Sequence, residues 1–408
     1  MAHAGLNFGI FLAPFHRLGD NPTLALGRDL DLLVALDQLG FDEAWIGEHH
    51  SAGWETIASP EIMIAAAAER TKHIKLGSGV TSLPYHHPFL VAQRFVQLDH
   101  MTRGRVMLGC GPGALVSDAY MMGIEAHTQR PRMEQALQAI MQLLACEGPI
   151  TIKTDWFELR EARLHLAPYT YPRFPISVAA STTPSGALAA AKHGLGLISL
   201  GAGLPGGPQK LAEQWRMAEA EAAKHGQTMD RKNWRLVVNM HCAEDDERAM
   251  RDCRIGERLE TETYFGETLG RPPTRTEDPL GEGLKAGTTL VGSPETVAKG
   301  IERLIGFTEG GPRDEKTGAY GAGGILFRAH EWADREQTLR SYELFARWVM
   351  PRFQGSLRMP AESREWCYQN REGIFAPNLQ ALKKAFMDAG QAVPEMERLK
   401  LRERPPAE

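Results

Sequence analysis

Hydrophobic and polar positions along the chain follow two alternating patterns. Short apolar runs of four to eight residues alternate with longer segments in which apolar residues recur every three or four positions. The short runs are typical of buried strands, and the longer segments are typical of helices with one apolar face. Their regular alternation predicts βα units around a parallel sheet.

Eight such units precede residue 350, and helix signals support several of them. Ser59 and Ser293 are each followed by a proline and a glutamate, which suit the cap and the first turn of a helix. Eight repeats favour an α/β fold of the TIM (β/α)8 barrel type over an open, doubly wound sheet. We expect strands at Phe8–Leu12, Glu43–Gly47, Ile74–Val80, Val106–Gly109, Pro175–Ala179, Gly196–Leu200, Arg235–Cys242 and Gly324–Phe327.

Insertions and a C-terminal extension accompany the barrel pattern. Residues 147–169 alternate in a way that predicts a β-hairpin outside the barrel. Gly266–Thr288 is rich in Gly, Pro and Thr, and it predicts a loop that is long enough to form a lid. We expect residues 1–350 to form the barrel and residues 351–408 to form an extension that packs on it or on a partner subunit. Within the extension, a helix is expected from about Pro377 to Gly390.

Composition excludes several classes of function. The chain has 408 residues, a formal net charge of −5 and a pI near 6.3, which offers no extended basic surface for nucleic acid. No segment approaches ~18 uninterrupted apolar residues, so we expect no membrane span. The five cysteines are scattered and form no C-x-x-C pair, which indicates a reducing cytoplasm and no disulfide framework.

In a parallel barrel the active site forms at the carboxyl ends of the strands. The segments that follow the expected strands are rich in glycine, serine, threonine and histidine, and they are poor in lysine. They are APFH, EHHS, TSLPYHHP, GCGPGAL, ASTTPSG, GAGLPGG and FRAH. Backbone N–H groups at glycines approach a phosphate closely, and hydroxyls donate to it without bulk. These segments therefore predict a cofactor that carries a phosphate group.

His49 is the strongest candidate for proton chemistry. It follows the second expected strand directly, beside Glu48, where an imidazole can face the barrel mouth and exchange protons near neutral pH. We expect no metal site, because neither the pair His49–His50 nor His86–His87 has further ligands at a recurring spacing. Ordinary hydrogen-bonded loop histidines remain the alternative for both pairs.

Other polar residues near the strand ends have more than one interpretation. Residues 109–113, GCGPG, indicate a tight turn more than a dinucleotide fingerprint, because the glycine spacing is wrong. Cys110 has no cationic surroundings, so we expect it to pack and not to act as a nucleophile. Two pairs reach the site only if their side of the strand points inward, and otherwise they pack outside: Asn239 with His241, and Arg328 with His330.

Four segments together carry a resemblance to a known family. They are FGIFLAPFH, LDQLGFDEAWIGEHH, ASPEIMIAAAAERTKHIKLGSGVTSLPYHHPFLVAQRFVQLDHMTRGRVMLGCGPG and AASTTPSGALAAAKHGLG. The chain resembles the bacterial luciferase-like flavin monooxygenase family from about Phe8 to Ala346, and within it the limonene 1,2-monooxygenase group.

This resemblance implies a TIM barrel that binds FMN as FMNH2, which a separate NAD(P)H:flavin reductase supplies. It implies that oxygen reacts with the reduced flavin to give a C4a-peroxyflavin. One oxygen atom would then enter a small hydrophobic substrate, by terpene-like alkene epoxidation or by Baeyer–Villiger oxidation. The relatives are commonly homodimers or larger homo-oligomers.

The resemblance also implies roles for individual residues. The histidine that matches His49 lies beside the flavin and supports its proton chemistry, and a non-proline cis peptide matches Gly79–Val80. The implied cofactor-binding positions are Ala13, Pro14, Gly79, Val80, Ser82, Leu83, Gly111, Ser181, Thr182, Gly201 and Gly203. Luciferases place an arginine for the phosphate where this chain has Pro112, so neutralisation must come from elsewhere or rest on N–H groups.

Two other functions remain open. An F420-dependent dehydrogenase shares the barrel fold, but the acidic tail of F420 favours basic residues, which the strand-end segments largely lack. A flavin-binding protein without turnover is the second alternative, and His49 and a chain long enough for a lid argue against it.

Overall fold

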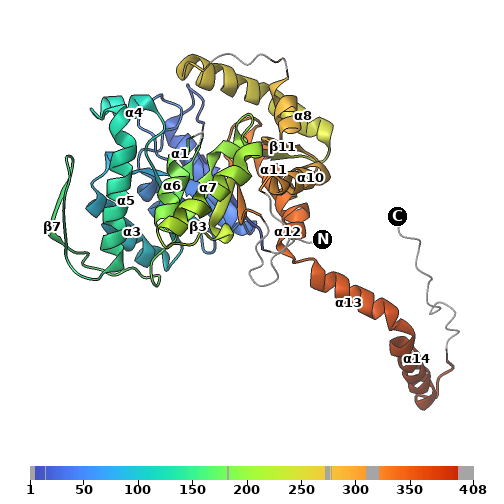
Figure 1. Cartoon of the computed structure of the whole chain (residues 1–408). Coiled ribbons are helices and arrows are strands. Elements are labelled where there is room, and N and C mark those ends of the chain that lie inside the picture. Colours follow the sequence, from blue (N-terminus) through green and yellow to red (C-terminus); the bar gives the residue numbers. More distant parts are fainter. Residues whose placement is uncertain are drawn as a thin grey trace. The chain divides into compact units, whose positions relative to one another are not determined.

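The structure is a computed structural model that describes residues 5–13, 15–181, 183–271, 276, 278–308 and 321–393. The described residues divide into two compact units. The first ends at Gln354 and contains the strands, and the second begins at Gly355 and is helical. Figure 1 gives the course of the chain.

Eight parallel strands close into a ring in the first unit. In order around the ring they are β1 (Asn7–Leu12), β2 (Glu43–Ile46), β3 (Lys75–Ser78), β5 (Val106–Gly111), β8 (Ile176–Ala180), β9 (Gly196–Ser199), β10 (Trp234–Cys242) and β12 (Gly324–Arg328). β12 pairs with both β10 and β1, which closes the ring. The predicted TIM (β/α)8 barrel is confirmed.

Helices follow the strands and surround them (Figure 1). They are α1 (Pro22–Gln38), α2 (Pro60–Ala68), α3 (Pro88–Thr102), α5 (Gln129–Ala145), α6 (Ser185–Lys192), α7 (Leu211–Lys224), α10 (Pro294–Gly306) and α11 (Arg335–Trp348). Ser293 caps α10 by accepting from the N–H of Thr296, as its position indicated. Ser59 holds the cap position of α2, but its side chain makes no capping hydrogen bond.

The barrel interior is filled partly by Trp45 of β2. A Cβ at Gly77 of β3 would lie 3.0 Å from the Trp45 ring, and one at Gly109 of β5 would lie 3.2 Å from it. The neighbouring strands therefore supply glycines where the indole needs space. This explains why glycine recurs in strands that are otherwise apolar.

The predicted hairpin is present as β6 (Ile150–Lys153) paired antiparallel with β7 (Glu158–Ala162). Figure 1 shows it beside α3 and α5. Phe157 and Leu159 are buried in the main core, and Trp156 donates to Gln135 of α5 at 2.6 Å. The hairpin is thus attached to the outer helices by both apolar and polar contacts.

The chain between β10 and β12 departs from the prediction. α8 (Asp246–Leu259) continues into a π-helix, η6 (Glu260–Thr268), and is followed by α9 (Pro279–Ala286) and β11 (Thr289–Gly292). The expectation of an irregular loop over Gly266–Thr288 is therefore wrong at both ends, although residues 272–275 and 277 lie outside the described part.

Local signals for α9 exist, but the loop-like composition obscures them. The side chain of Asp278 caps the helix by accepting from the N–H of Gly281, and Pro279 holds its first position. Gly287 ends it in a left-handed conformation. β11 then pairs with the carboxyl half of β10, from Asn239 to Cys242.

The second unit contains α13 (Arg358–Gln369) and α14 (Arg371–Asp388). The prediction of a helix beginning near Pro377 is wrong about its start, because the helix runs through this proline and begins at Arg371. One missing N–H removes one hydrogen bond, and the helix-forming residues on both sides continue the turn. No described helix is apolar enough over a sufficient length to cross a membrane.

Candidate active site at the carboxyl rim of the barrel

The ends of β1, β2 and β3 meet at the carboxyl rim. Gly47 donates its N–H to Leu12 at 2.9 Å, and Gly79 donates to Ile46 at 2.6 Å. Ala13 is buried directly after β1. The peptide bond between Gly79 and Val80 is cis, as the resemblance implied. Two of the predicted positions, Pro14 and Thr182, lie outside the described residues.

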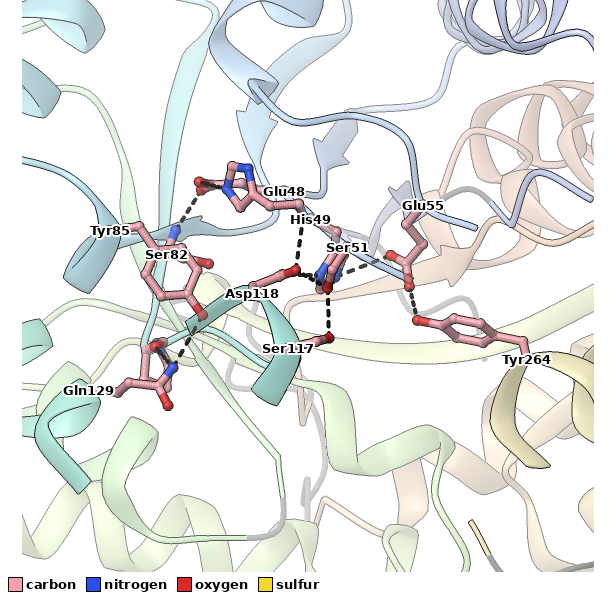
Figure 2. Close-up of polar contacts among 12 residues, drawn as sticks. Glu48, His49, Ser51, Glu55, Ser82, Tyr85, Ser117, Asp118, Gln129 and Tyr264 are labelled. Atoms are coloured by element: carbon pink, nitrogen blue, oxygen red, sulfur yellow. Dashed lines mark hydrogen bonds and ion pairs between the residues drawn. The ribbon is translucent and has the colours of Figure 1, made fainter. Parts of the chain in front are cut away.

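His49 lies at this rim, between two carboxylates (Figure 2). Its Nδ1 is 3.2 Å from Oδ2 of Asp118, which belongs to the short helix α4 (Val116–Met121) after β5. Its Nε2 is 3.2 Å from Oε2 of Glu55, an ion-pair distance without hydrogen-bond geometry. The imidazole is 15% exposed and the Asp118 carboxylate is 1% exposed, so water screens this contact weakly.

The two carboxylates determine the protonation of His49. Burial alone lowers the pKa of this imidazole, but the hydrogen bond to Asp118 and the charge of Glu55 outweigh burial and raise it above its ordinary value. Burial conversely raises the pKa of Asp118, and its hydrogen bonds to His49 and Ser51 bring it below its ordinary value. Both shifts favour a cationic imidazole beside an ionised carboxylate over the neutral pair.

Asp118 also connects two strand ends. Its Oδ1 accepts from the hydroxyl of Ser51 and, at 3.1 Å, from the N–H of His50. Ser51 in turn shares a 2.7 Å hydrogen bond with Ser117. The segment after β2 is thus held against α4 by four polar contacts around one buried carboxylate (Figure 2).

Glu48 organises the remaining histidines. It is buried and accepts from the N–H of Ser82 at 2.7 Å, and its other oxygen lies 2.9 Å from Nε2 of His50 and 2.5 Å from Nε2 of His86. Burial raises the pKa of Glu48, but the two histidine hydrogen bonds lower it overall. Glu48 and His50 thus belong to one polar network, and His49 between them belongs to the other. An acid and two histidines follow β2 because these successive side chains point alternately into the two networks.

The second carboxylate at His49 depends on the inserted segment. Tyr264 of η6 donates its hydroxyl to Oε1 of Glu55 at 2.7 Å. Its ring packs edge-on against Phe15, at 4.7 Å between centroids, and in a tilted arrangement against Trp54, at 5.7 Å. Short π-helical stretches are rare in proteins, but those that occur are often found at functional sites. Here one of them positions the carboxylate of Glu55, which faces the imidazole of His49.

The structure places the predicted cofactor positions in different surroundings. Ser82 and Leu83 are buried, and a Cβ at Gly111 would come within 2.5 Å of Val80. Ser181 and Gly201 line one cavity, of about 290 Å³, at the ends of β8 and β9. Gly203 lines a second cavity, of about 470 Å³. The two cavities share Leu204 and Pro205, so they are neighbours.

Lys210 is a cation that the strand-end segments did not reveal. It lies in the turn Pro208–Lys210 before α7 and lines the smaller cavity with Ser181 and Gly201. The carbonyl of Pro112, at the position where luciferases have arginine, accepts from Gln129 instead at 2.9 Å. The sequence pattern could not place Lys210, because it follows β9 by eleven residues.

The larger cavity resolves the pairs whose orientation was open. Asn239 and Arg328 line it, together with apolar side chains from β1, β10, η6 and α9. His241 is buried 3.5 Å from Asp252 of α8, and His330 stacks on Trp332 at 4.1 Å. One member of each pair reaches the cavity, and the other packs away from it.

Three residues of the site were not foreseen, namely Glu55, Asp118 and Tyr264. No motif marks them, since each lies between barrel strands. Glu55 and Asp118 reach His49, and Tyr264 reaches Glu55, only through the folded chain. Cys110 is fully buried, and burial raises the pKa of its thiol, which agrees with the expected packing role. Within the described residues, no group of three or more His, Cys, Asp or Glu is placed to hold a metal ion.

Comparisons with known proteins show which proteins the chain resembles. The chain is 46% identical over 353 residues to limonene 1,2-monooxygenase of Rhodococcus erythropolis, which covers 86% of this chain and 88% of that protein. It is 44% identical over 365 residues to 4-hydroxyprotoasukamycin monooxygenase of Streptomyces nodosus subsp. asukaensis, which covers 88% of this chain and 96% of that protein.

A solved structure extends the comparison. It is the oxygenating constituent of 3,6-diketocamphane monooxygenase from the CAM plasmid of Pseudomonas putida, a type II Baeyer–Villiger monooxygenase in complex with FMN. It matches with a TM-score of 0.72 and 26% identity over 86% of this chain and 99% of that one. Residues 6–311 match the family described as Luciferase-like monooxygenase. The protein therefore belongs to the luciferase-like monooxygenase family of oxygenases.

Proposed function

We propose that the protein is a two-component monooxygenase that uses FMNH2 and O2 to insert one oxygen atom into a small hydrophobic organic substrate. A separate NAD(P)H:flavin reductase would supply the reduced flavin. The observation that carries the proposal is the imidazole of His49, held by Asp118 and Glu55 at the carboxyl rim. The FMN complex of the diketocamphane enzyme supports the choice of cofactor.

The residues at the barrel mouth fit FMN chemically. The smaller cavity offers a lysine, Lys210, a hydroxyl, Ser181, and the backbone at Gly201, which together suit a phosphate. We infer that the isoalloxazine ring lies towards the cis Gly79–Val80 peptide, as the resemblance implies. When bound, reduced FMN supplies the two electrons that are needed to place one oxygen atom in the substrate and release the other as water.

His49 would hold a proton for this chemistry. Its Nδ1 is engaged by Asp118, whereas the contact of Nε2 with Glu55 lacks hydrogen-bond geometry. The proton on Nε2 is therefore the one that remains available to a bound group. Its raised pKa keeps this proton in place to a higher pH than in an ordinary histidine. The largely apolar side chains of the neighbouring cavity would exclude water, which otherwise diverts oxygen to hydrogen peroxide.

The test is to mix the purified protein anaerobically with photoreduced FMN, admit 18O2, and follow oxygen consumption and the return of oxidised flavin. We expect a delay between the two in the wild type and a shorter delay in His49→Ala. With cyclic alkenes or ketones present, one 18O atom should enter an epoxide or an ester.

Two results would contradict the proposal. One is simultaneous oxygen consumption and flavin reoxidation at the rate of free FMNH2, together with tight binding of F420, which would indicate a dehydrogenase. The other is a His49→Ala profile identical to that of the wild type. As a matched control, His225→Ala removes an exposed histidine on the outer surface that pairs with Glu221, and it should leave the delay unchanged.

A further inference from the structure

Glu55 has one carboxylate oxygen that the surrounding protein leaves unpaired. The side chain is buried, and its Oε2 lies 3.2 Å from Nε2 of His49. This contact lacks hydrogen-bond geometry, and Oε2 has no hydrogen-bond partner among the residues that the structure describes. A buried acceptor without a donor costs free energy, and more so on a charged group. The carboxylate must therefore be held by another contact, since a small turn would align it with the imidazole.

Tyr264 provides that contact (Figure 2). Its hydroxyl donates to Oε1, the other oxygen of Glu55, at 2.7 Å. Burial and the charge of Glu55 raise the pKa of this phenol, so the hydroxyl keeps the proton that it donates. The two oxygens of a carboxylate move together. Turning Oε2 into line with Nε2 of His49 would therefore displace Oε1 from the hydroxyl and break a charge-assisted hydrogen bond.

The ring of Tyr264 is fixed by its neighbours, so the hydroxyl cannot follow the carboxylate. The ring packs edge-on against Phe15 and Phe265, at 4.7 and 5.0 Å between centroids. Trp54 packs against it in a tilted arrangement at 5.7 Å, and the Nε1–H of this indole donates to Thr268 at 3.1 Å. Tyr264 and Thr268 both belong to η6. The π-helix thus holds the hydroxyl, and with it the carboxylate, in one place.

We propose that Tyr264 is a positioning residue whose hydroxyl holds the Glu55 carboxylate out of line with Nε2 of His49, so that the charge of Glu55 acts on the imidazole while the Nε2 proton stays free. The inference rests on the proposed function, because it takes this proton to be the one that His49 gives to a bound group. A carboxylate aligned with Nε2 would compete with that group for the proton. The imidazole is 15% exposed, so part of it remains accessible from the barrel mouth.

Other titratable groups also face His49, and they are held independently of Tyr264. Asp118 of α4 is hydrogen-bonded to Nδ1, and the charge of Glu48 also favours the cationic imidazole. The charges of His50 and His49 oppose each other. His50 is hydrogen-bonded to both Asp118 and Glu48, so these three residues hold one another. Removing the Tyr264 hydroxyl therefore changes the surroundings of Nε2 and leaves those of Nδ1 in place.

Tyr264→Phe tests the proposal, because it removes the hydroxyl and keeps the ring among its aromatic neighbours. NMR of the flavin-free protein with 15N-labelled histidine follows the resonances of His49 against pH, and His49→Ala assigns them. Without the hydroxyl, Glu55 should turn and accept from Nε2. We expect the Nε2 proton resonance to move downfield, its exchange with water to slow about tenfold, and the pKa of His49 to rise.

The double variant Tyr264→Phe with Glu55→Gln separates this effect from a general change of structure. Glu55→Gln alone should lower the pKa of His49, because an amide carries no charge. If Tyr264 acts through Glu55, adding Tyr264→Phe to Glu55→Gln should change none of the three readouts further. Tyr169→Phe is the matched control, since Tyr169 is exposed and packs edge-on against another histidine, His100. It should leave the resonances of His49 unchanged.

A lowered or unchanged pKa of His49 in Tyr264→Phe overturns the inference, because the hydroxyl would then keep Glu55 near the imidazole or not act on it. An equal effect of Tyr264→Phe in the Glu55→Gln background overturns it as well. In turnover with FMNH2 and O2, Tyr264→Phe should form more hydrogen peroxide and less product than the wild type. The expected NMR changes with an unaltered product yield would reject the role of His49 in the proposed function and leave the positioning of Glu55 standing. The two failures are therefore distinguishable.

Discussion

Both ring nitrogens of His49 face carboxylate oxygens at 3.2 Å, one of Asp118 and one of Glu55. The doubly protonated imidazole donates from Nδ1 to Asp118, and its positive charge is balanced by Glu55 without a hydrogen bond to it. One carboxylate would be enough to orient the imidazole, and the second carboxylate also favours its charged form. The arrangement therefore suits a site at which a bound group with negative charge, or a bound oxygen atom, must receive a proton.

Replacing Asp118 by Asn should move the pH dependence of product yield per FMNH2. In the wild type the raised pKa of His49 means that its protonated form is present at low pH and is lost as the pH rises through that pKa. Asp118→Asn removes the charge, so this pKa falls and the alkaline limb of the yield moves to lower pH. The measurement is product and hydrogen peroxide per FMNH2 from pH 6 to 9, with the matched control Ser117→Ala. An unmoved alkaline limb would show that His49 does not control coupling.

Replacing Lys210 by Met should weaken binding of reduced FMN about threefold to tenfold, because an exposed cation contributes modestly to holding a phosphate. Reduced riboflavin, which lacks the phosphate, should bind both proteins equally. Lys192→Met is the control, since Lys192 pairs with Glu134 elsewhere on the barrel. Equal affinity of wild type and Lys210→Met for reduced FMN in anaerobic titrations would remove Lys210 from the phosphate site.

Individual residues were predictable where the chain itself places them at a strand end. His49 lies just after β2, so its position in the sequence was enough to expect it at the rim, whereas the cis Gly79–Val80 peptide after β3 was implied by the family resemblance. Glu55 and Asp118 lie in connections, and nothing in their neighbours indicates that they converge on one imidazole. Side chains in loops obtain their partners from the tertiary fold, which no local pattern encodes.

The packing of α8 against the end of the barrel depends on a glycine. A Cβ at Gly256 would come within 2.6 Å of the carbonyl carbon of Trp332, a backbone atom that cannot turn aside. Trp332 in turn contacts Glu260, the first residue of η6. The close approach of α8 therefore helps to position Trp332 and Glu260, which both line the larger cavity.

Gly256→Ala should destabilise the protein by about 1 to 3 kcal/mol, because α8 must move away from the Trp332 backbone. Gly306→Ala is the matched control in another helix, α10, where the new methyl group meets no atom within 4 Å. It should be neutral or stabilise by up to about 1 kcal/mol. Urea unfolding of both variants decides the point, and equal free energies of unfolding would contradict the packing argument.

Elements with a regular period were predicted, and those with mixed composition were not. The eight barrel strands and the hairpin were recognised because their apolar residues recur with a strand or helix period. α9 and β11 are short and lie in a segment rich in Gly, Pro and Thr, so composition outweighed the capping signals at Asp278 and Gly287. Composition describes the average of a segment, whereas a cap acts at one position.

A buried ion pair braces the ring near the amino ends of its strands. Glu43 of β2 and Arg235 of β10 are hydrogen-bonded to each other, although β1 and β12 lie between their strands. Those two strands supply glycines there, since a Cβ at Gly9 would lie 2.7 Å from the Glu43 side chain and one at Gly324 would lie 2.9 Å from Arg235. The pair crosses two strands that leave room for it.

Glu43→Gln should reduce the free energy of unfolding by about 3 to 5 kcal/mol, because it leaves a buried guanidinium without its counter-charge. The double variant Glu43→Leu with Arg235→Met removes both charges and should recover most of that loss. Urea unfolding with the fluorescence of the buried tryptophans measures both. A single variant as stable as the wild type would show that the pair does not brace the barrel.

The closure of the barrel was predictable because the number of βα repeats fixes it. Eight repeats with strands apolar on both faces leave a closed ring as the natural arrangement. The Glu43–Arg235 pair was not predictable, since Glu43 begins a strand whose charged residue could equally have faced solvent. The sequence therefore indicated the ring and its functional rim, and the fold was needed to show what crosses its interior.

A crystal structure of the protein soaked with FMN is the measurement on which the account depends. We expect the phosphate between Ser181, Gly201 and Lys210, and the isoalloxazine ring against the cis Gly79–Val80 peptide with the imidazole of His49 at its edge. Flavin density away from this rim, or a His49 side chain turned out of reach of the ring, would contradict it.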